Sequence, residues 1–344
     1  MTDKKIYIQS AKQISMQQPL CEQWMTQPEW HQESIVHACD PNFRDYMAAG
    51  EARRMGKLMK RAITTALLVM QETAIEHPDA IITGTALGSL DCTERLLQHL
   101  SENGEKAFSP THFMQSTHNT VGSSLGIYTK THGYNTTYSH GQMSFDWAVL
   151  DAWMQIQLGK INNALVGGHE EIVESYSHLL EKIGYIGKYG MVPYGEVAVE
   201  MIFNTNNTTS ALCELAGISI CNCYSEDDLE ISIAKLLTQA GIEIKDIDAV
   251  MTGKNGNPNH DKFYASALQC LPQAQSLMYK PLFGENFTAS AFGLYAAAHC
   301  LKKGTVPVCL FENADAQTTS QLRNLLLINQ MNGKEYSFIL LKQL

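Results

Sequence analysis

The segment YNTTYSHGQMSFDWA, residues 134–148, followed by NALVGGHE, residues 163–170, decides the fold of this chain. Its first residues are rich in Thr and Tyr, which suit the pleated surface of a strand. Gly141 allows a sharp turn, because glycine has no Cβ. Apolar residues then recur at helical spacing at Ala148, Ala152 and Ile156. The order strand, turn, helix, strand predicts a βαβ unit whose first helical turn points backbone N–H groups into a pocket.

This arrangement resembles the nucleophile turn of the β-ketoacyl synthases, enzymes of the thiolase fold. In that family a Cys at the turn is followed by Ser or Thr, an Ala-rich helix, a Gly, and a strand that closes in Gly-Gly. Counting back from Gly159 and from Gly167 puts the family's cysteine at Gln142. The chain therefore keeps the pattern of the turn and lacks its thiol.

Length and composition favour a globular protein. The 344 residues can bury one double-lobed core or two cores. Hydrophobic residues make up 44% of the chain, which is too apolar for disorder. A net charge of −10 argues against nucleic-acid binding, since phosphates are neutralised by clustered Lys and Arg. The one basic run, residues 53–61, could steer an acidic partner such as an acyl carrier protein, or simply form a solvated helix flank.

The chain shows no targeting or metal-binding pattern. Its start lacks the apolar stretch of a secretory signal, and no run approaches the ~20 apolar residues of a membrane span. We therefore expect a cytoplasmic protein without membrane contact. Nine cysteines lie mostly in apolar segments, which indicates buried reduced thiols. Cys221 and Cys223 lack the second pair that a zinc site needs, so we expect no metal and no cofactor.

Periodicity divides the chain into further elements. Expected strands are 6–14, 80–85, 134–139, 165–168, 195–203, 212–221, 247–253, 305–311, 323–329 and 336–342. Expected helices are 48–76, one opening at 88, 117–130, 226–240, 261–270 and 288–301. Segments 16–46 and 171–194 are expected to be irregular, and 280–284 to be a loop.

The resemblance implies an α/β fold made of two similar βαβ halves in a layered α-β-α-β-α sandwich. The polar segment 204–210 is a suitable boundary between them, which gives an N-terminal half over 1–205 and a C-terminal half over 206–344. In the thiolase fold the strand before the nucleophile turn pairs with its copy across a two-fold axis. Residues 134–139 are therefore expected at a dimer interface.

Condensing activity in the family needs more than the thiol. Two imidazoles polarise the malonyl carbonyl, and backbone N–H groups stabilise the oxyanion. The first His lies ahead of a Pro and an Asp; Pro258 and Asp261 hold those places here, so the His position falls on Gly253. His260 is the nearest substitute, although a His in a loop can also be an ordinary surface residue.

The second imidazole is also missing. In the family this His follows a Lys by five residues, inside a Gly-His pair. Lys280 is present, but the pair reads Gly284-Glu285. Lys280 and Glu285 either form an ion pair in the emptied pocket or both face solvent. In the family a Gly-rich segment near the carboxyl end, the gate, helps to form the oxyanion hole with its backbone. Residues 331–334 correspond loosely to this gate but lack its Gly-rich pattern.

Three reactive positions are thus changed together, and this combination resembles the chain-length factors, the silent partner subunits of type II ketosynthases. Gln142 has no nucleophilic lone pair, but it can fill the space of a cysteine and make hydrogen bonds. The resemblance implies no condensing activity by the chain alone. It implies a heterodimer with an active ketosynthase, or a homodimer, and an acyl carrier protein as a further partner. Phe145 and Trp147, after Gln142, are candidates for shaping the acyl cavity, or ordinary core residues.

Other functions stay open. The product of such a complex could be a polyketide, an aryl-polyene or a fatty-acid-type chain. Gln in place of Cys also occurs in decarboxylating relatives, so a malonyl-carrier decarboxylase that primes synthesis is an alternative. A divergent 3-oxoacyl carrier-protein synthase of this acyltransferase family is another. The third alternative function is a homodimeric acyl-binding scaffold.

Overall fold

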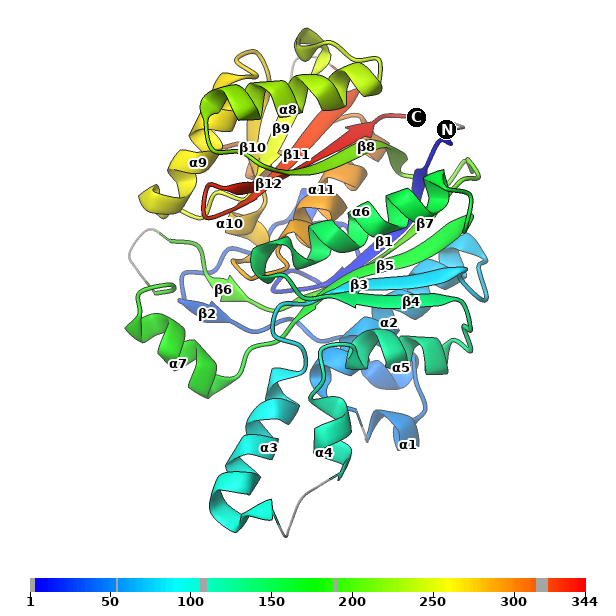
Figure 1. Cartoon of the computed structure of the whole chain (residues 1–344). Helices are drawn as coiled ribbons and strands as arrows, with labels where there is room; N and C mark the ends of the chain where they lie inside the picture. Colours follow the sequence, from blue (N-terminus) through cyan, green and yellow to red (C-terminus); the bar gives the residue numbers. More distant parts are fainter. Residues whose placement is uncertain (1–3, 54, 106–109, 188–190, 314–320) are drawn as a thin grey trace.

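The computed structural model describes residues 4–344 except 54, 106–109, 188–190 and 314–320. Ten strands of this part form one sheet in the order β10-β9-β11-β12-β8-β1-β7-β5-β3-β4 (Figure 1). Their bounds are β1 Tyr7–Ile14, β3 Ala80–Gly84, β4 Tyr134–Tyr138, β5 Asn163–Glu170, β7 Val197–Asn204, β8 Cys213–Asn222, β9 Ala249–Thr252, β10 Gln275–Met278, β11 Asn324–Met331 and β12 Glu335–Lys342. A separate parallel pair joins β2 (Ile35–Val36) to β6 (Tyr194–Gly195).

The two ends of this sheet have the same topology. In the first half of the chain the strands lie in the order β4-β3-β5-β7-β1, and in the second half in the order β10-β9-β11-β12-β8. Each order contains parallel pairs at the outer end and antiparallel pairs toward the centre. Between the two groups, β1 pairs with β8 through a short ladder, Tyr7↔Glu214 and Ile8↔Cys213. The division at residue 205, between β7 and β8, stays a prediction.

Helices form three layers around these strands (Figure 1). α2 (Lys57–Thr73) and α5 (Thr120–Tyr128) cover one face of the first group, where they bury apolar side chains of β3, β5 and β7. α6 (Ser144–Gln157) and α11 (Ser290–Lys303) lie in the central core, which both groups share. α8 (Glu226–Gln239) and α9 (Pro258–Gln269) cover the outer face of the second group. The layers therefore follow the expected order α-β-α-β-α.

The remaining helices lie outside these layers. They are α1 (Ala49–Ala52), α3 (Leu90–Asn103), α4 (Pro110–Gln115), α7 (Glu174–Lys182) and the short α10 (Lys280–Phe283). α3 and α4 project beyond β4 and α5, while α7 stands beside β2 and β6 (Figure 1). Neither α7 nor α10 follows from the sequence pattern. In α7 only Ser177 and Leu180 are buried, so the helix leaves almost no apolar periodicity.

Three further expectations are wrong. Segment 305–311 forms no strand, because Pro307 removes a backbone donor and a 3₁₀ turn follows at Val308–Leu310. The basic run does not form one solvated flank, since Arg61 is buried in α2. Its guanidinium binds Asp40 at 3.1 Å and Glu196 at 2.8 Å. The single helix expected over 48–76 is also divided into α1 and α2.

Close backbone packing sets the position of α6 on the first group of strands. A methyl group added at Gly84, the last residue of β3, would lie 2.6 Å from the Cα and N atoms of Phe145. Since both partners are backbone, neither can turn away. Gly84→Ala should therefore lower the free energy of unfolding by about 1–3 kcal/mol through overpacking.

Urea unfolding of the full chain measures this effect. Gly50→Ala is the matched control, because a methyl group at residue 50 meets nothing within 4 Å. Equal stability of the two variants would contradict the packing argument.

Candidate functional site

The nucleophile turn is built around Gly141 and Ser144. Gly141 has φ +51°, and the 3₁₀ turn Gly141–Met143 leads directly into α6. The Ser144 hydroxyl donates to the Gly141 carbonyl at 2.7 Å and accepts from the His140 N–H at 2.8 Å. These two bonds hold Gln142 at the start of α6, where the family carries its nucleophile.

The side chain and the backbone of Gln142 are both engaged. Its amide Nε2 donates to the Tyr185 hydroxyl at 3.0 Å, and the Tyr185 ring stacks on Phe287 with centroids 5.7 Å apart. Its carbonyl accepts from Asn329 Nδ2 at 2.9 Å. A hydrogen-bonded amide therefore lies at the position predicted for the nucleophile, with two aromatic rings beside it.

Asp146, one turn into α6, anchors this arrangement. Its buried carboxylate accepts hydrogen bonds from Ser290 Oγ at 2.8 Å, Asn329 Nδ2 at 2.8 Å, and Ser337 Oγ. Burial raises the pKa of Asp146 above its ordinary value, while these donors oppose that rise. Sequence reasoning missed Asp146, although an acid within an otherwise apolar helix start is a recognisable signal.

The position of the first missing His is closed by tyrosines. A methyl group at Gly253 would lie 2.6 Å from the Tyr264 hydroxyl, 2.9 Å from the Tyr279 hydroxyl and 3.2 Å from Lys280 Cε. Both tyrosines are fully buried, on α9 and just before α10. An imidazole at residue 253 therefore has no room. Neither tyrosine is marked by a motif, and sequence reasoning missed both.

Lys280 and Glu285 form a buried ion pair, and neither faces solvent. Lys280 Nζ lies 3.0 and 2.8 Å from the two carboxylate oxygens of Glu285. Asn255 Nδ2 donates to the same carboxylate at 2.6 Å. The pair is thus both charge-balanced and hydrogen-bonded, as buried charges must be.

The structure connects the four predicted positions, Gln142, Gly253, Lys280 and Glu285, through a series of contacts, which we call the contact chain. Gln142 binds Asn329, and the Tyr264 hydroxyl donates to Asn329 Oδ1 at 3.3 Å. Tyr264 lies against Gly253, which in turn lies against Lys280. Asn329, on β11, links the two halves of the site and was not predicted.

His260 lies beside Tyr264, and its Nε2 is buried without a hydrogen-bond partner among the described residues, so its role as a substitute imidazole stays a prediction. Its Nδ1 lies 3.3 Å from Asp261 Oδ1, and its ring meets the edge of Tyr264 at 5.4 Å. The hairpin at residues 331–334 does lie over the turn, since a methyl group at Gly141 would be 3.3 Å from Met331 Sδ. The gate segment thus keeps its place without its Gly-rich pattern.

The two cavity-shaping candidates lie in different surroundings. Phe145 is fully buried in the central core, with its ring against Gly168. Trp147 is partly exposed, and its Nε1 donates to Glu335 Oε1 at 3.0 Å. His140 binds the other oxygen of Glu335 at 2.9 Å and meets the Trp147 ring edge-on. A role of either ring in limiting an acyl chain stays a prediction.

Two carboxyl groups at the carboxyl end of β5 have raised pKa values. Glu170 accepts from the N–H of Ala86 and, at 3.4 Å, from the N–H of Leu87. Burial nonetheless raises the pKa of Glu170 to about 8, and that of its neighbour Glu171 to about 7. The three hydrogen-bond donors of Glu170, which are Thr85, Ala86 and Leu87, oppose this rise.

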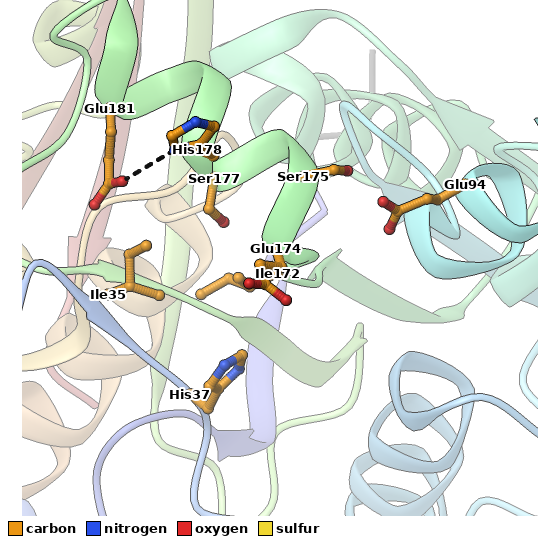
Figure 2. Close-up of a pocket in the computed structure, with 9 residues that line it drawn as sticks. All are labelled: Ile35, His37, Glu94, Ile172, Glu174, Ser175, Ser177, His178 and Glu181. Carbon is orange, nitrogen blue, oxygen red and sulfur yellow. Dashed lines mark ion pairs between the residues drawn. The ribbon is translucent and has the colours of Figure 1, made fainter. Parts of the chain in front are cut away.

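A separate pocket of about 730 Å³ lies under α7 (Figure 2). Ile35 and Ile172 line it together with Glu94, Glu174 and further polar residues, and His178 lies 3.9 Å from Glu181 at its edge. None of the residues of the contact chain lines it. Among the described residues, no group of three His, Cys, Asp or Glu side chains could hold a metal ion. No described helix is long and apolar enough to cross a membrane.

The model of the family "Beta-ketoacyl synthase, N-terminal domain" matches residues 21–225. The chain belongs to the β-ketoacyl synthase family. Comparison with curated protein sequences gives no match.

Solved structures of similar shape agree with this family. The ishigamide ketosynthase/chain length factor aligns over 100% of both chains with a TM-score of 0.82 and 15% identity. A type II PKS acyl-carrier protein in complex with its ketosynthase contains a chain with a TM-score of 0.80 and 13% identity, covering 99% of this chain and 100% of that one. The ketosynthase ApeO in complex with its chain length factor ApeC from Xenorhabdus doucetiae gives a TM-score of 0.79 at 14% identity. This match covers 99% of this chain and 98% of that one. These likenesses confirm the thiolase-like fold.

The raised pKa of Glu170 predicts a pH dependence of stability in this synthase homologue. The folded protein keeps the proton up to about pH 8, while the unfolded chain loses it near the ordinary value of 4.5. The unfolded state therefore binds fewer protons between these values, and the free energy of unfolding should fall as pH rises through this window. One such group contributes a slope of at most about 1.4 kcal/mol per pH unit.

Urea unfolding at pH values from about 5 to about 8 tests this sign. Glu170→Gln keeps the acceptor for the Ala86 N–H and should reduce the slope. Glu76→Gln, on an exposed residue, is the control and should keep the wild-type profile. An unchanged slope in Glu170→Gln would show that Glu170 is already ionised.

Proposed function

We propose that this chain is a catalytically silent ketosynthase-like subunit, a chain-length factor, that pairs with an active β-ketoacyl carrier-protein synthase. The observation that carries the proposal is the contact chain from Gln142 through Asn329 and Tyr264 to Gly253 and Lys280. Gln142 is hydrogen-bonded and Glu285 is ion-paired there, and the hydroxyls of two tyrosines lie against Gly253. The complex would elongate a polyketide, aryl-polyene or fatty-acid-type chain, and a cytoplasmic location stays a prediction.

The chemical requirements of condensation support the proposal that the chain has no condensing activity. An acyl chain needs a thiolate to accept it, and Gln142 offers only an amide whose nitrogen donates to Tyr185. The malonyl carbonyl needs imidazole donors, and the cation nearest to Gly253 is Lys280, which Glu285 already neutralises. The three positions therefore offer neither a thiolate nor an imidazole donor.

The surface around β4 supports a partner subunit. β4 is the last strand in the sheet order of the described residues, so one of its edges is open. On α5 beside it, Ile127 is 80% exposed, and on α4 Met114 is 66% exposed. An open strand edge flanked by exposed apolar side chains is a surface that a partner covers. The solved complexes of ketosynthases with a chain length factor and with an acyl carrier protein support the same two kinds of partner by analogy.

One observation favours a second candidate, a malonyl-carrier decarboxylase. The Tyr279 hydroxyl is buried at the first His position and has no hydrogen-bond partner among the described residues. Burial raises the pKa of Tyr279 well above its ordinary value, so it would remain a donor able to stabilise an enolate. Acetyl-carrier formation from a malonyl carrier, lost in Tyr279→Phe, would identify this activity. A divergent synthase and a homodimeric scaffold have no such support.

The first prediction from this proposal is that the chain alone forms no covalent acyl adduct. After incubation with acyl-carrier substrates, intact mass spectrometry should show the unmodified mass. Gln142→Cys restores a thiol, yet it should give no condensation product, because Gly253 and Glu285 still cannot polarise the malonyl carbonyl. Condensation by either protein alone would refute catalytic silence.

The second prediction is that residues 134–138 pair with a partner subunit. Co-expression with a β-ketoacyl synthase that keeps its Cys and both His residues, taken from the same gene neighbourhood, should give a heterodimer. Ile127→Glu should weaken it by at least about tenfold, because a charge is buried without a partner.

Ile231→Glu is the matched control, since Ile231 is 65% exposed on α8, at the opposite end of the molecule (Figure 1). Sedimentation velocity distinguishes heterodimer, homodimer and monomer. A stable monomer in the presence of the synthase would exclude the pairing.

A further inference from the structure

Two thiols lie side by side at the end of β8, in the second group of strands. Cys221 belongs to the strand, which ends at Asn222, and Cys223 follows it. Their sulfur atoms are 3.5 Å apart. Residues two apart in an extended strand point to the same face, but their short side chains meet only when both turn toward each other. The pair is therefore arranged as a dithiol, and it lies outside the contact chain.

The two thiols differ in their access to solvent. Cys223 is 2% exposed and shares the buried cluster under α8 with Leu229 and Ile233, whereas Cys221 is partly exposed. Burial, together with the hydrogen bond to Cys221, raises the pKa of Cys223 to about 12. Cys221 is thus the thiol that a reagent in solution reaches first, and Cys223 lies directly behind it.

The backbone spacing permits a bond between these sulfur atoms. A disulfide joins Cα atoms roughly 4.4–6.8 Å apart, and residues i and i+2 of an extended strand are separated by roughly 6.6 Å. An S–S bond is about 2 Å long, so the two sulfur atoms must approach by roughly 1.5 Å. Cys223 can supply this movement, because it lies beyond the last ladder pair, Asn222↔Glu335. A bridge at the wide end of the range is readily reduced again, which makes it reversible.

The dithiol is also tied to the hairpin of residues 331–334, which lies over the nucleophile turn. The Cys223 N–H donates to the Lys334 carbonyl at 2.7 Å. Glu335, the next residue, binds His140 of that turn at 2.9 Å. A shift of Cys223 toward its partner thiol therefore acts directly on this hairpin.

We infer that Cys221 and Cys223 form a modification site, a dithiol that a low-molecular-weight disulfide such as oxidised glutathione converts to an intramolecular disulfide, and that the new bond loosens the hairpin over the nucleophile turn. The inference goes beyond the proposed function and does not depend on it. In a reducing compartment disulfides are mostly transient and redox-sensing, which fits a reversible bond of this kind.

The reaction consists of two exchange steps. The Cys221 thiolate attacks one sulfur of oxidised glutathione, the glutathione S–S bond breaks, and the departing thiolate takes up a proton. Cys223 then loses its proton to solvent and attacks the Cys221 sulfur, which releases the second glutathione as a thiolate that is protonated in turn. Two protein thiols are oxidised to one disulfide, and one oxidised glutathione is reduced to two thiols.

Differential alkylation of the full-length protein, followed by peptide mapping, tests the site. After incubation with oxidised glutathione, Cys221 and Cys223 should lose their free thiols together and appear in one disulfide-linked peptide. Cys213 and Cys300, which are as buried as Cys223, are the internal controls and should keep their thiols. Free thiols at both Cys221 and Cys223 after this treatment would overturn the inference.

Serine variants separate the roles of the two thiols. Cys223→Ser should stop after the first step and carry one glutathione on Cys221, whereas Cys221→Ser should leave the buried Cys223 unmodified. Cys270→Ser is the matched control and should form the disulfide as the wild type does, since the partly exposed Cys270 thiol donates to the Ser266 carbonyl at 3.7 Å. A lasting glutathione adduct on Cys221 of the wild type, with Cys223 still free, would show that the two sulfur atoms cannot bond.

Hydrogen exchange measures the effect on the hairpin. In the oxidised protein the Cys223 amide should exchange at least about tenfold faster, because its bond to the Lys334 carbonyl is weakened. The amide of Phe338, in the middle of β12, is the control and should exchange equally in both forms. Dithiothreitol should restore slow exchange at Cys223. Equal exchange of Cys223 in the reduced and oxidised forms would refute the link to the hairpin.

Pairing with a synthase is a separate measurement, so the two proposals fail separately. If the reduced chain pairs with the synthase but forms no disulfide between Cys221 and Cys223, the inference is wrong while the proposed function stands. If the disulfide forms and the reduced chain does not pair, the proposed function is wrong and the modification site stands.

Discussion

The buried carboxylate of Asp146 is the constraint on which the site depends. A carboxylate without solvent is costly unless its oxygens are satisfied, and all three of its side-chain donors come from the second half of the chain. Asn329 also binds the carbonyl of Gln142. The nucleophile turn of the first half is therefore held in place only once α11, β11 and β12 of the second half have packed against it.

Packing and charge couple the predicted site residues to one another. Removing one partner of a buried ion pair costs roughly 3–5 kcal/mol, so neither Lys280 nor Glu285 can change alone without leaving an uncompensated charge. The tyrosine hydroxyls that close the space at Gly253 prevent the return of an imidazole there. The reactive positions thus form one coupled set, in which restoring a single family residue disturbs the contacts of the others.

Local patterns explain how much of the fold the sequence predicts. Apolar runs in β11 and β12 and helical spacing in α8 are strong, and a capping box of Ser225 with Asp228 opens α8. α7 and the turn after Pro307 were missed or misread, because few of their side chains are buried and the pattern is correspondingly weak. Motif spacing likewise identified Gln142 and the Lys280–Glu285 pair. Tyr264, Tyr279 and Asn329 carry no motif, since only tertiary packing brings these distant elements together.

Packing also explains the form of the turn at Gln142. Gly84 and Gly168 lie against Phe145, so the crossing of α6 over β3 and β5 admits no side chain at either glycine. The same crossing orders the strands whose outermost member, β4, presents the open edge. A thiol at residue 142 contributes nothing to these contacts. The form of the turn is therefore a packing requirement of the sheet and its edge.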